Sequence, residues 1–263
     1  MTHPPGDNFA GPLPHSYGTF CDDFYVNVRL GSHLPMPSER GTVLHFLEQM
    51  QRGFPGLLNF RSADAGECHL EEDRRGNAYR WVSLERRRLA AGHVNPPTLE
   101  EAARLHRLAL KIAPYQLGIS AVEVEYLDVL LGFDLEFNGD HEDVLAETLF
   151  AGSPLACLLE EPDARPAEFA PAAVVSLSED RSLQARLEVL TRANSVRLGG
   201  DADGAAEDVI SVYFTLRRHW RPRPAGDFEA VFDDLLTRAD ALAARYVVPG
   251  VLRPISQAIA SRS

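Results

Sequence analysis

Lysine and cysteine are both scarce in this chain. Lys111 is the only lysine, so arginine supplies nearly all of the 26 basic side chains. The three cysteines, Cys21, Cys68 and Cys157, are odd in number and far apart, and they form no CxxC pair. This usage argues against a disulfide framework and favours a reduced, cytoplasmic setting.

Long apolar runs are missing as well. No stretch approaches the ~18–20 consecutive apolar residues of a membrane span. The opening segment, MTHPPGDNFAGPLPHSYGTF, lacks the basic and apolar regions of a secretory signal. Its Pro, Gly and His content predicts a disordered tail over residues 1–20. We therefore expect a soluble protein with no membrane partner.

Positive charge is in deficit. The formal net charge is −12, which argues against broad binding to nucleic acid or to anionic membranes. The 263 residues are 45% hydrophobic, which is ample for a core in one large domain or two small ones.

The common catalytic motifs do not occur in the sequence. Without a GxSxG elbow, no hydrolase-type nucleophile is indicated. The nine histidines form no HxH, HxxxH or HExxH pair, so no metal site is predicted. Neither GxGxxG nor a phosphate loop is present, and no cofactor is predicted. Whether the protein is an enzyme stays open, with a non-enzymatic role favoured.

Residues 122–137, VEVEYLDVLLGFDLEF, form the longest strand-like run. Every odd position from 127 to 137 is apolar, whereas Asp128, Asp134 and Glu136 stand at even positions. Such period-two alternation predicts a strand with one buried face. The phase reverses upstream of this run, so a bulge or bend is expected near Tyr126–Leu127.

The remaining elements flank this strand. A capping box at Thr98 and Glu101 starts a helix that Pro114 is expected to end. Pro249 and Gly250 are expected to break a long final helix that begins at residue 227. Other strands are predicted at 24–30, 56–61, 67–72, 79–84, 86–94, 172–177, 183–190 and 209–216, and other helices at 38–52 and 143–150. The fold class is therefore α+β: a mostly antiparallel sheet with helices on one face, built from a β-α-β-β-α-β first half, then three strands and a long C-terminal helix.

The Pro-rich acidic segment 161–171 is the best internal boundary. It would connect a first half, 21–160, to a second half, 172–263, packed on it, unless the two form one continuous domain. On the runs YLDVLLGFDLEF and VISVYFTLRR, and on the order of elements from residue 24 to about 260, the layout resembles a sporadically distributed family of uncharacterised bacterial proteins of similar length. That resemblance implies a fold and no activity.

Three acidic strand residues are candidate site residues. Asp134 and Glu136 share a face because they are two apart on a strand, and Asp128 lies on the same face. Paired carboxylates could perform acid–base chemistry or bind a cation, although a solvent-facing strand has the same pattern and is favoured. His141, in the acidic loop NGDHED, is a further candidate, against a favoured interpretation in which Asp140 caps a helix.

The segment 217–223, RRHWRPR, is the one basic and aromatic cluster. Arg217, Arg218 and Trp220 could contact phosphates and stack on bases. In so acidic a chain, a salt-bridged surface or a dimer contact is favoured, and nucleic acid is not an expected partner.

Three functions follow, in order of preference. The first is a non-enzymatic interaction or scaffold protein that binds an unknown protein or a second copy of itself. The second is an enzyme acting on a small cationic or metal-bound ligand through the strand carboxylates. The third is a nucleic-acid-associated accessory factor. A pocket lined by converging polar groups would favour the second, a flat apolar sheet face the first, and a continuous positive stripe the third.

Overall fold

The computed structural model describes residues 17–62, 67–191, 209–220 and 227–262. Residues 1–16 of the predicted tail lie outside this part of the chain. Residues 17–20 form a turn in which Tyr17 is buried, and the Tyr17 hydroxyl donates to Asp240 Oδ1 at 2.5 Å. The Tyr17 ring packs on Phe24 and Phe133, with centroids 5.1 and 5.3 Å away.

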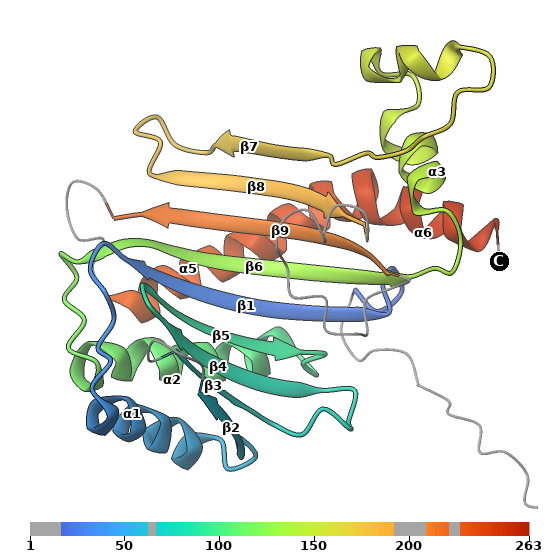
Figure 1. The fold of residues 1–263 in the computed structure, drawn as a ribbon. Coiled ribbons are helices and arrows are strands. Elements are labelled where there is room, and N and C mark those ends of the chain that lie inside the picture. The colour runs from blue at the N-terminus through green and yellow to red at the C-terminus, as the bar shows by residue number, and fades with distance from the viewer. Residues whose placement is uncertain (1–16, 63–66, 192–208, 221–226, 263) are drawn as a thin grey trace, which may run out of the picture.

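A single antiparallel sheet forms the body of the protein (Figure 1). Its strand order is β2-β3-β4-β5-β1-β6-β9-β8-β7. The strands are β1 (Asp23–Ser32), β2 (Asn59–Ser62), β3 (Cys68–Glu71), β4 (Tyr79–Glu85), β5 (Arg88–Val94), β6 (Val124–Glu136), β7 (Ala172–Ser176), β8 (Leu183–Leu190) and β9 (Val209–His219). The predicted α+β class is confirmed.

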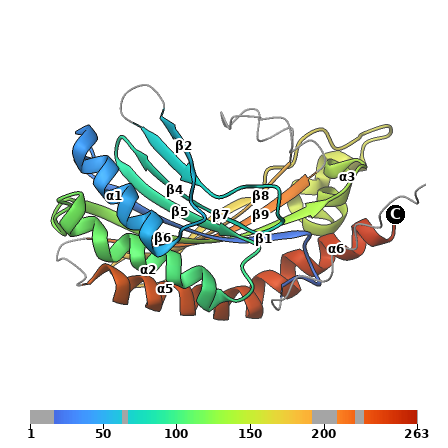
Figure 2. The same cartoon turned by 90° about the horizontal axis from the view of Figure 1, so that it is seen from below.

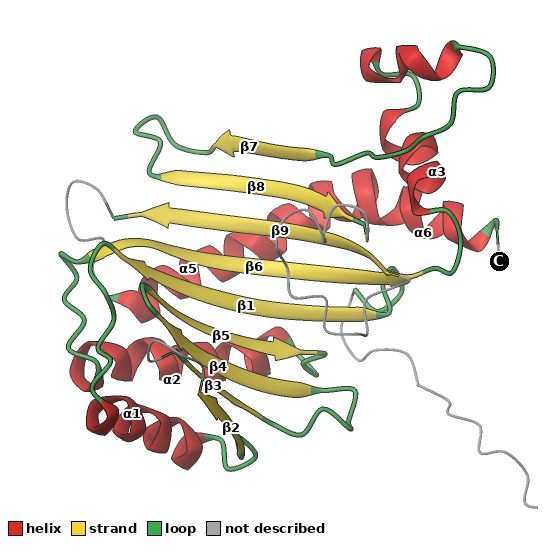
Figure 3. Ribbon diagram, viewed as in Figure 1, coloured by secondary structure: helices red, strands yellow, loops and turns green. Residues whose placement is uncertain are grey.

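The main helices cover one face of this sheet, and among the described residues no main helix covers the other, which we call the open face (Figure 2). They are α1 (Arg40–Gly53), α2 (Leu99–Gln116), α5 (Phe228–Leu242) and α6 (Arg253–Ala260), with the π-helical η4 (Ala243–Leu252) joining the last two. Two short elements, α3 (His141–Leu145) and the π-helical η2 (Ala146–Phe150), lie beside α6, and the 3-10 helical η3 (Pro154–Glu160) contacts η2 (Figure 3). Within the described residues, no helix is both long and apolar enough to cross a membrane.

Strand β6 is central, as its sequence predicts. It pairs with β1 on one side and β9 on the other. Its apolar odd residues are buried beneath the helices, and α5 packs directly on it. The register against β1 shifts where Gly31 pairs with Tyr126 but Ser32 pairs with Val124. Glu125 is therefore the extra residue, next to the position at which the phase reversal predicted a bulge.

The two halves of the sequence share this sheet. Strand β9 belongs to the second half and pairs with β6 of the first half. The pairing runs from Tyr126↔His219 to Glu136↔Val209. Strands β8 and β7 then extend the same sheet outward. The segment 161–171 connects η3 to β7.

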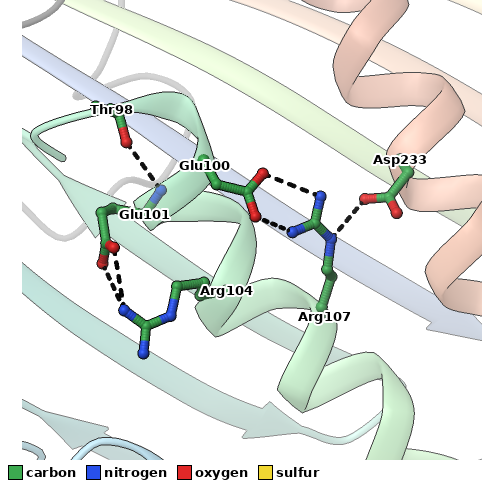
Figure 4. Close-up of polar contacts among 6 residues, drawn as sticks. All are labelled: Thr98, Glu100, Glu101, Arg104, Arg107 and Asp233. Carbon is green, nitrogen blue, oxygen red and sulfur yellow. Dashed lines mark hydrogen bonds and ion pairs between the residues drawn. The ribbon is translucent and has the colours of Figure 1, made fainter.

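Helix α2 begins as predicted (Figure 4). Thr98 Oγ1 accepts a hydrogen bond from the Glu101 backbone N–H at 3.1 Å, which satisfies one of the free donors of the first turn. The Glu101 carboxylate pairs with Arg104 at 3.0 Å instead of completing the capping box. Further along, Arg107 bridges to Asp233 of α5 at 2.9 Å and so joins the two helices.

Two prolines that were expected to end helices do not. Pro114 lies inside α2, which continues to Gln116. It sits in the last turn, where the helix has little further to run. Pro249 lies inside η4, whose wider π-helical turns avoid the clash between a proline ring and the carbonyl four residues earlier. The chain then continues helically to Ala260.

Candidate functional site

The open face of the sheet carries polar and aromatic side chains, and several of its aromatic rings lie directly against the main chain. Three glycines on it lie under aromatic rings from adjacent strands: Gly132 under Tyr25, Gly92 under Trp81 and Gly31 under Tyr126. A Cβ on Gly132 would come within 2.0 Å of the Tyr25 ring, and one on Gly92 within 2.3 Å of Trp81 Nε1. These positions require glycine because the rings rest on the backbone.

A cavity of about 610 Å³ opens on this face. Strands β1, β4, β5 and β6 form its floor and walls, and the β3–β4 turn overhangs it. We call it the Asn27 pocket. Its lining residues are Asp23, Tyr25, Asn27, Arg74, Arg75, Gly76, Asn77, Tyr79, Trp81, Val94 and Asp134.

Asn27 lies in the floor of this pocket and is only 9% exposed. Its side-chain amide forms no hydrogen bond to any residue that the structure describes, and Oδ1 is fully shielded from solvent. Leaving a buried amide without a partner costs about 1–3 kcal/mol. The Asn27 amide lies in the cavity wall and destabilises the fold by that amount, so it is a candidate ligand contact.

Asp134 contributes a carboxylate to the same pocket. Tyr25 Oη donates a hydrogen bond to Asp134 Oδ1 at 3.1 Å. Burial raises the pKa of Asp134 to about 6, against the opposing hydrogen bonds from Ser211 and Tyr25, and the nearby charge of Asp23 raises it further. Burial also raises the pKa of Tyr25 well above its usual value, so this hydroxyl remains a donor. Asp134 therefore changes charge near neutral pH.

Asn95 fixes two walls of the pocket. It is buried, adopts a left-handed backbone conformation with φ 47°, and accepts a hydrogen bond from Phe24 N at 2.9 Å. Its Nδ2 donates to Asp23 Oδ1 and to the Asn77 main-chain carbonyl. One side chain thus holds the acid of β1 and the β3–β4 turn in place.

The two arginines at the rim are already paired with acids. Arg74 Nη2 lies 2.7 Å from Glu71 Oε2, and Arg75 Nη2 lies 2.5 Å from Asp73 Oδ2. Glu71 is buried and also contacts Arg61 and His69, at 2.7 and 3.1 Å. Each rim arginine therefore has an acidic partner, although Arg74 shares Glu71 with Arg61, and Asp23 and Asp134 add negative charge to the pocket.

A second cavity, of about 440 Å³, lies on the same face. Trp81 lines both cavities. We call the second one the Arg29 pocket. Its lining residues are Arg29, Arg61, Ser62, Glu67, Cys68, His69, Trp81, Ser83, Leu84, Glu85, Arg88 and Ala90.

Two of the candidates predicted from sequence, Asp128 and Arg217, form a structural pair. Arg217 Nε and Nη2 donate to the two oxygens of Asp128, each at 2.7 Å, and the guanidinium stacks on Tyr126 at 3.9 Å from the ring centroid. Asp128 is 1% exposed, and both its oxygens have a partner. This geometry is that of a buried salt bridge on the open face.

The rest of the basic and aromatic cluster does not form one surface. Arg217 and Arg218 are consecutive on β9 and point to opposite faces of the sheet. Arg218 donates to Ser182 Oγ at 3.1 Å, and Trp220 is buried against Phe228 with centroids 5.3 Å apart. Residues 221–226 lie outside the described part of the chain.

Glu136 and His141 lie outside both pockets. Glu136 is exposed at the end of β6. His141 is the first residue of α3, and its Nε2 lies 2.7 Å from the Phe137 carbonyl. Asp140 caps that helix by accepting from Glu142 and Asp143 N–H groups, the interpretation that the sequence favoured. In the described ranges, no group of three or more His, Cys, Asp or Glu is placed to hold a metal ion.

Most residues of the Asn27 pocket were missed from sequence. Of the predicted candidates, only Asp134 lines it. One signal was available: in FYVNVRL the polar positions Tyr25, Asn27 and Arg29 alternate with apolar ones, and they share a face with the even positions of β6.

We find no protein-family model and no curated protein sequence that matches the chain. The function must therefore be argued from the geometry.

Proposed function

We propose that the protein binds a small cationic ligand, such as an amine, in the Asn27 pocket. The observation that carries this proposal is a single cavity lined both by the buried, unpartnered Asn27 Oδ1 and by the carboxylate of Asp134, which pairs with β1 four residues away, at Asp23. Of the three functions considered from sequence, the second was an enzyme acting on a small cationic or metal-bound ligand through the strand carboxylates, and this proposal keeps the ligand class and the carboxylates without the catalysis. A pocket with converging polar groups was the feature expected to favour it.

The charge and aromatic content of the pocket support a cation. Asp23 and Asp134 supply negative charge, and the rings of Tyr25, Tyr79 and Trp81 line the cavity, with Arg74 already over the Tyr79 ring and His69 stacked on Trp81. A cation within ~6 Å of a ring face is attracted by the ring quadrupole. The volume of about 610 Å³ suits a ligand of ordinary metabolite size, since small-molecule pockets span ~300–1,000 Å³.

The test is calorimetric titration of the full chain with putrescine, choline and agmatine, and with the neutral alcohol 1,4-butanediol as control. We expect saturable binding of at least one amine and none of the alcohol. Asp134→Asn should weaken amine binding about tenfold or more, since a charged hydrogen bond contributes ~1.5–3 kcal/mol. Glu136→Gln, which removes a carboxylate two residues along β6 but outside the pocket, is the matched control. Equal losses from both variants would contradict the proposal.

The pH dependence of binding sharpens this test. Because the pKa of Asp134 is raised to about 6, its carboxylate is largely neutral at pH 5 and charged at pH 7. An alkylamine stays protonated across that range. Amine affinity should therefore increase from about pH 5 to about pH 7 in the wild type and stay level in Asp134→Asn.

Acid–base catalysis at the same site is a second candidate, favoured by the position of Asp134. A carboxylate with a pKa near 6, hydrogen-bonded to a neutral tyrosine, is suited to proton transfer near neutral pH. Mass spectrometry of a bound amine after prolonged incubation separates the two functions. Recovery of the unchanged ligand indicates a binding protein, and a product that Asp134→Asn fails to form indicates an enzyme.

The interaction role that the sequence favoured has one feature in its support. All five residues of the edge strand β7 are exposed, and none is charged. Unprotected edge strands are sites of strand addition, by a second copy or another protein. If β7 mediates self-association, Val174→Lys should shift a dimer to a monomer in analytical ultracentrifugation. A cytoplasmic location likewise remains a proposal, supported by the three free cysteines.

A further inference from the structure

The geometry points to a second binding site on the open face, in the Arg29 pocket, that takes an oxyanion such as a phosphate or a carboxylate group. Apart from Trp81, it uses different residues from the Asn27 pocket, so it can be tested independently of the proposed amine.

Arg29 is the central observation. It lies partly buried in the middle of β1 and lines the cavity. Its side chain forms neither a hydrogen bond nor an ion pair with any described residue. A guanidinium carries five N–H donors in a planar fork that matches carboxylate and phosphate oxygens. The Arg29 guanidinium is partly buried and has no acceptor within the described protein, so it is available to bind an anionic ligand.

The obvious internal partner is already engaged. Asp128 faces Arg29 across the β1–β6 pairing, and both its oxygens accept hydrogen bonds from Arg217 at 2.7 Å. Arg217 is held in turn by stacking on Tyr126. Asp128 is therefore neutralised by another arginine, and the charge of Arg29 is left over.

The rest of the lining adds positive charge and room. Three arginines, Arg29, Arg61 and Arg88, face two glutamates, Glu67 and Glu85, among the lining residues. Arg88 pairs with Glu85, and Arg61 pairs with Glu71. His69, stacked on Trp81 with centroids 5.7 Å apart, adds a ring nitrogen that lies 3.1 Å from Glu71. Because Glu71 is shared by Arg61 and Arg74, the four arginines Arg29, Arg61, Arg74 and Arg88 outnumber the three glutamates Glu67, Glu71 and Glu85, and one positive charge is left.

Small residues leave space beside the guanidinium. Ala90 pairs with Arg29 across the β1–β5 ladder, and Ser83 pairs with Ala90 across the next. Both residues are buried and have short side chains, so they do not fill the cavity of about 440 Å³ above them. The Ser83 hydroxyl can donate to an oxyanion as well.

The two pockets are close enough for one ligand to reach both, an extension that rests on the proposed function. Asn27 and Arg29 lie on the same face of β1 two residues apart, a separation of about 7 Å along the strand. Asp134 lies six residues along β6 from Asp128, the strand partner of Arg29, so a ligand with an amine at Asp134 and an anionic group at Arg29 would have to span about 20 Å past Trp81.

The test uses inorganic phosphate and, in a separate arm, acetate, with ionic strength held constant by sodium chloride. Binding is measured by chemical-shift perturbation and by the shift in melting temperature. We expect saturable phosphate or acetate binding in the millimolar range, and the stronger of the two identifies phosphate or carboxylate as the natural group. Arg29→Gln should weaken it about tenfold or more.

Arg87→Gln is the matched control, because it removes the same charge from an exposed position in the adjacent β4–β5 turn, outside the cavity. Arg29→Lys, which keeps the charge and loses the fork, should show intermediate affinity and provides a second variant if Arg29→Gln unfolds. Equal phosphate responses in wild type and Arg29→Gln, or an equal loss in Arg87→Gln, would overturn the inference. Because no amine is present, the result is independent of the test of the Asn27 pocket.

Discussion

The two faces of strand β6 follow different rules. Toward the helices, its side chains are apolar and fully packed, and Leu131 and Phe133 have no exposed surface. Toward the open face, the same strand carries Asp128, Gly132 and Asp134. Their neighbours include an unpartnered amide and an unpartnered arginine. The covered face therefore maximises stability, whereas the open face retains polar groups that weaken it, which is the usual sign of a functional surface.

The largest effect should come from placing a charge on the covered face. Leu131→Asp or Phe133→Asp should abolish folding, because an unpaired buried charge costs several kcal/mol against a total stability of ~5–15 kcal/mol. Circular dichroism and thermal melting measure this. Glu136→Gln, on the same strand at an exposed position, should melt like the wild type. A folded Leu131→Asp variant with an unchanged melting temperature would refute the assignment of the two faces.

On the open face, the contribution of Asp134 should depend on pH. Its pKa is about 6 in the folded protein and 3.8 as its ordinary value. Between those values the folded state binds a proton that the unfolded state does not, so stability falls as pH increases through this window and is level above it. The loss is on the order of 2–3 kcal/mol. Urea denaturation at about pH 4 and pH 7 should show the difference in wild type but not in Asp134→Asn.

Breaking the buried salt bridge on the open face should cost less than a charge in the core. Arg217→Met leaves Asp128 buried without its partner, and about 2 kcal/mol is expected because Arg217 is itself 37% exposed in its side chain. Arg238→Met breaks a surface pair with Asp234 and should cost below ~0.5 kcal/mol. Denaturation midpoints of the two variants, compared side by side, decide whether burial makes the difference.

The contact between Gly132 and Tyr25 should be worth about 1–2 kcal/mol. Gly132→Ala places a methyl group within the Tyr25 ring, which must then shift. The double variant Tyr25→Ala/Gly132→Ala should recover most of the cost that Gly132→Ala adds, because the clash is gone. A double-mutant cycle in urea measures the coupling. Additive effects would mean that the ring and the glycine are independent.

Apart from the surface pair of Arg238, the smallest effect concerns a helix that covers the apolar face. Thr98→Ala removes the cap of α2 and should cost about 1 kcal/mol. Thr98→Ser keeps the hydroxyl and should leave the denaturation midpoint nearly unchanged. A midpoint equally unaffected by alanine would show that this cap contributes nothing to stability.

The sequence predicted the covered face better than the open one, for a physical reason. Alternation in β6 and the Thr98 cap are local patterns, readable from neighbouring residues. Pro114 and Pro249 misled because a proline stops a regular α-helix interior, and neither lies in one. The Asn27 pocket joins residues from four strands and a turn through cross-strand register, which no local pattern encodes. Asp134 was identified as a candidate, but the sequence could not distinguish it from Asp128. The difference lies in their partners, because Asp128 is paired with Arg217 and Asp134 with the Tyr25 hydroxyl.

The glycines beneath the aromatic rings have a consequence for motion. Because the Tyr25 and Trp81 rings rest on bare main chain, the backbone beneath each ring restricts its rotation. Ring flips of Tyr25 should therefore be slow enough to give distinct resonances for its two ring edges. A ligand entering the Asn27 pocket would meet rings whose motion is already restricted, so less entropy is lost in ordering them on binding.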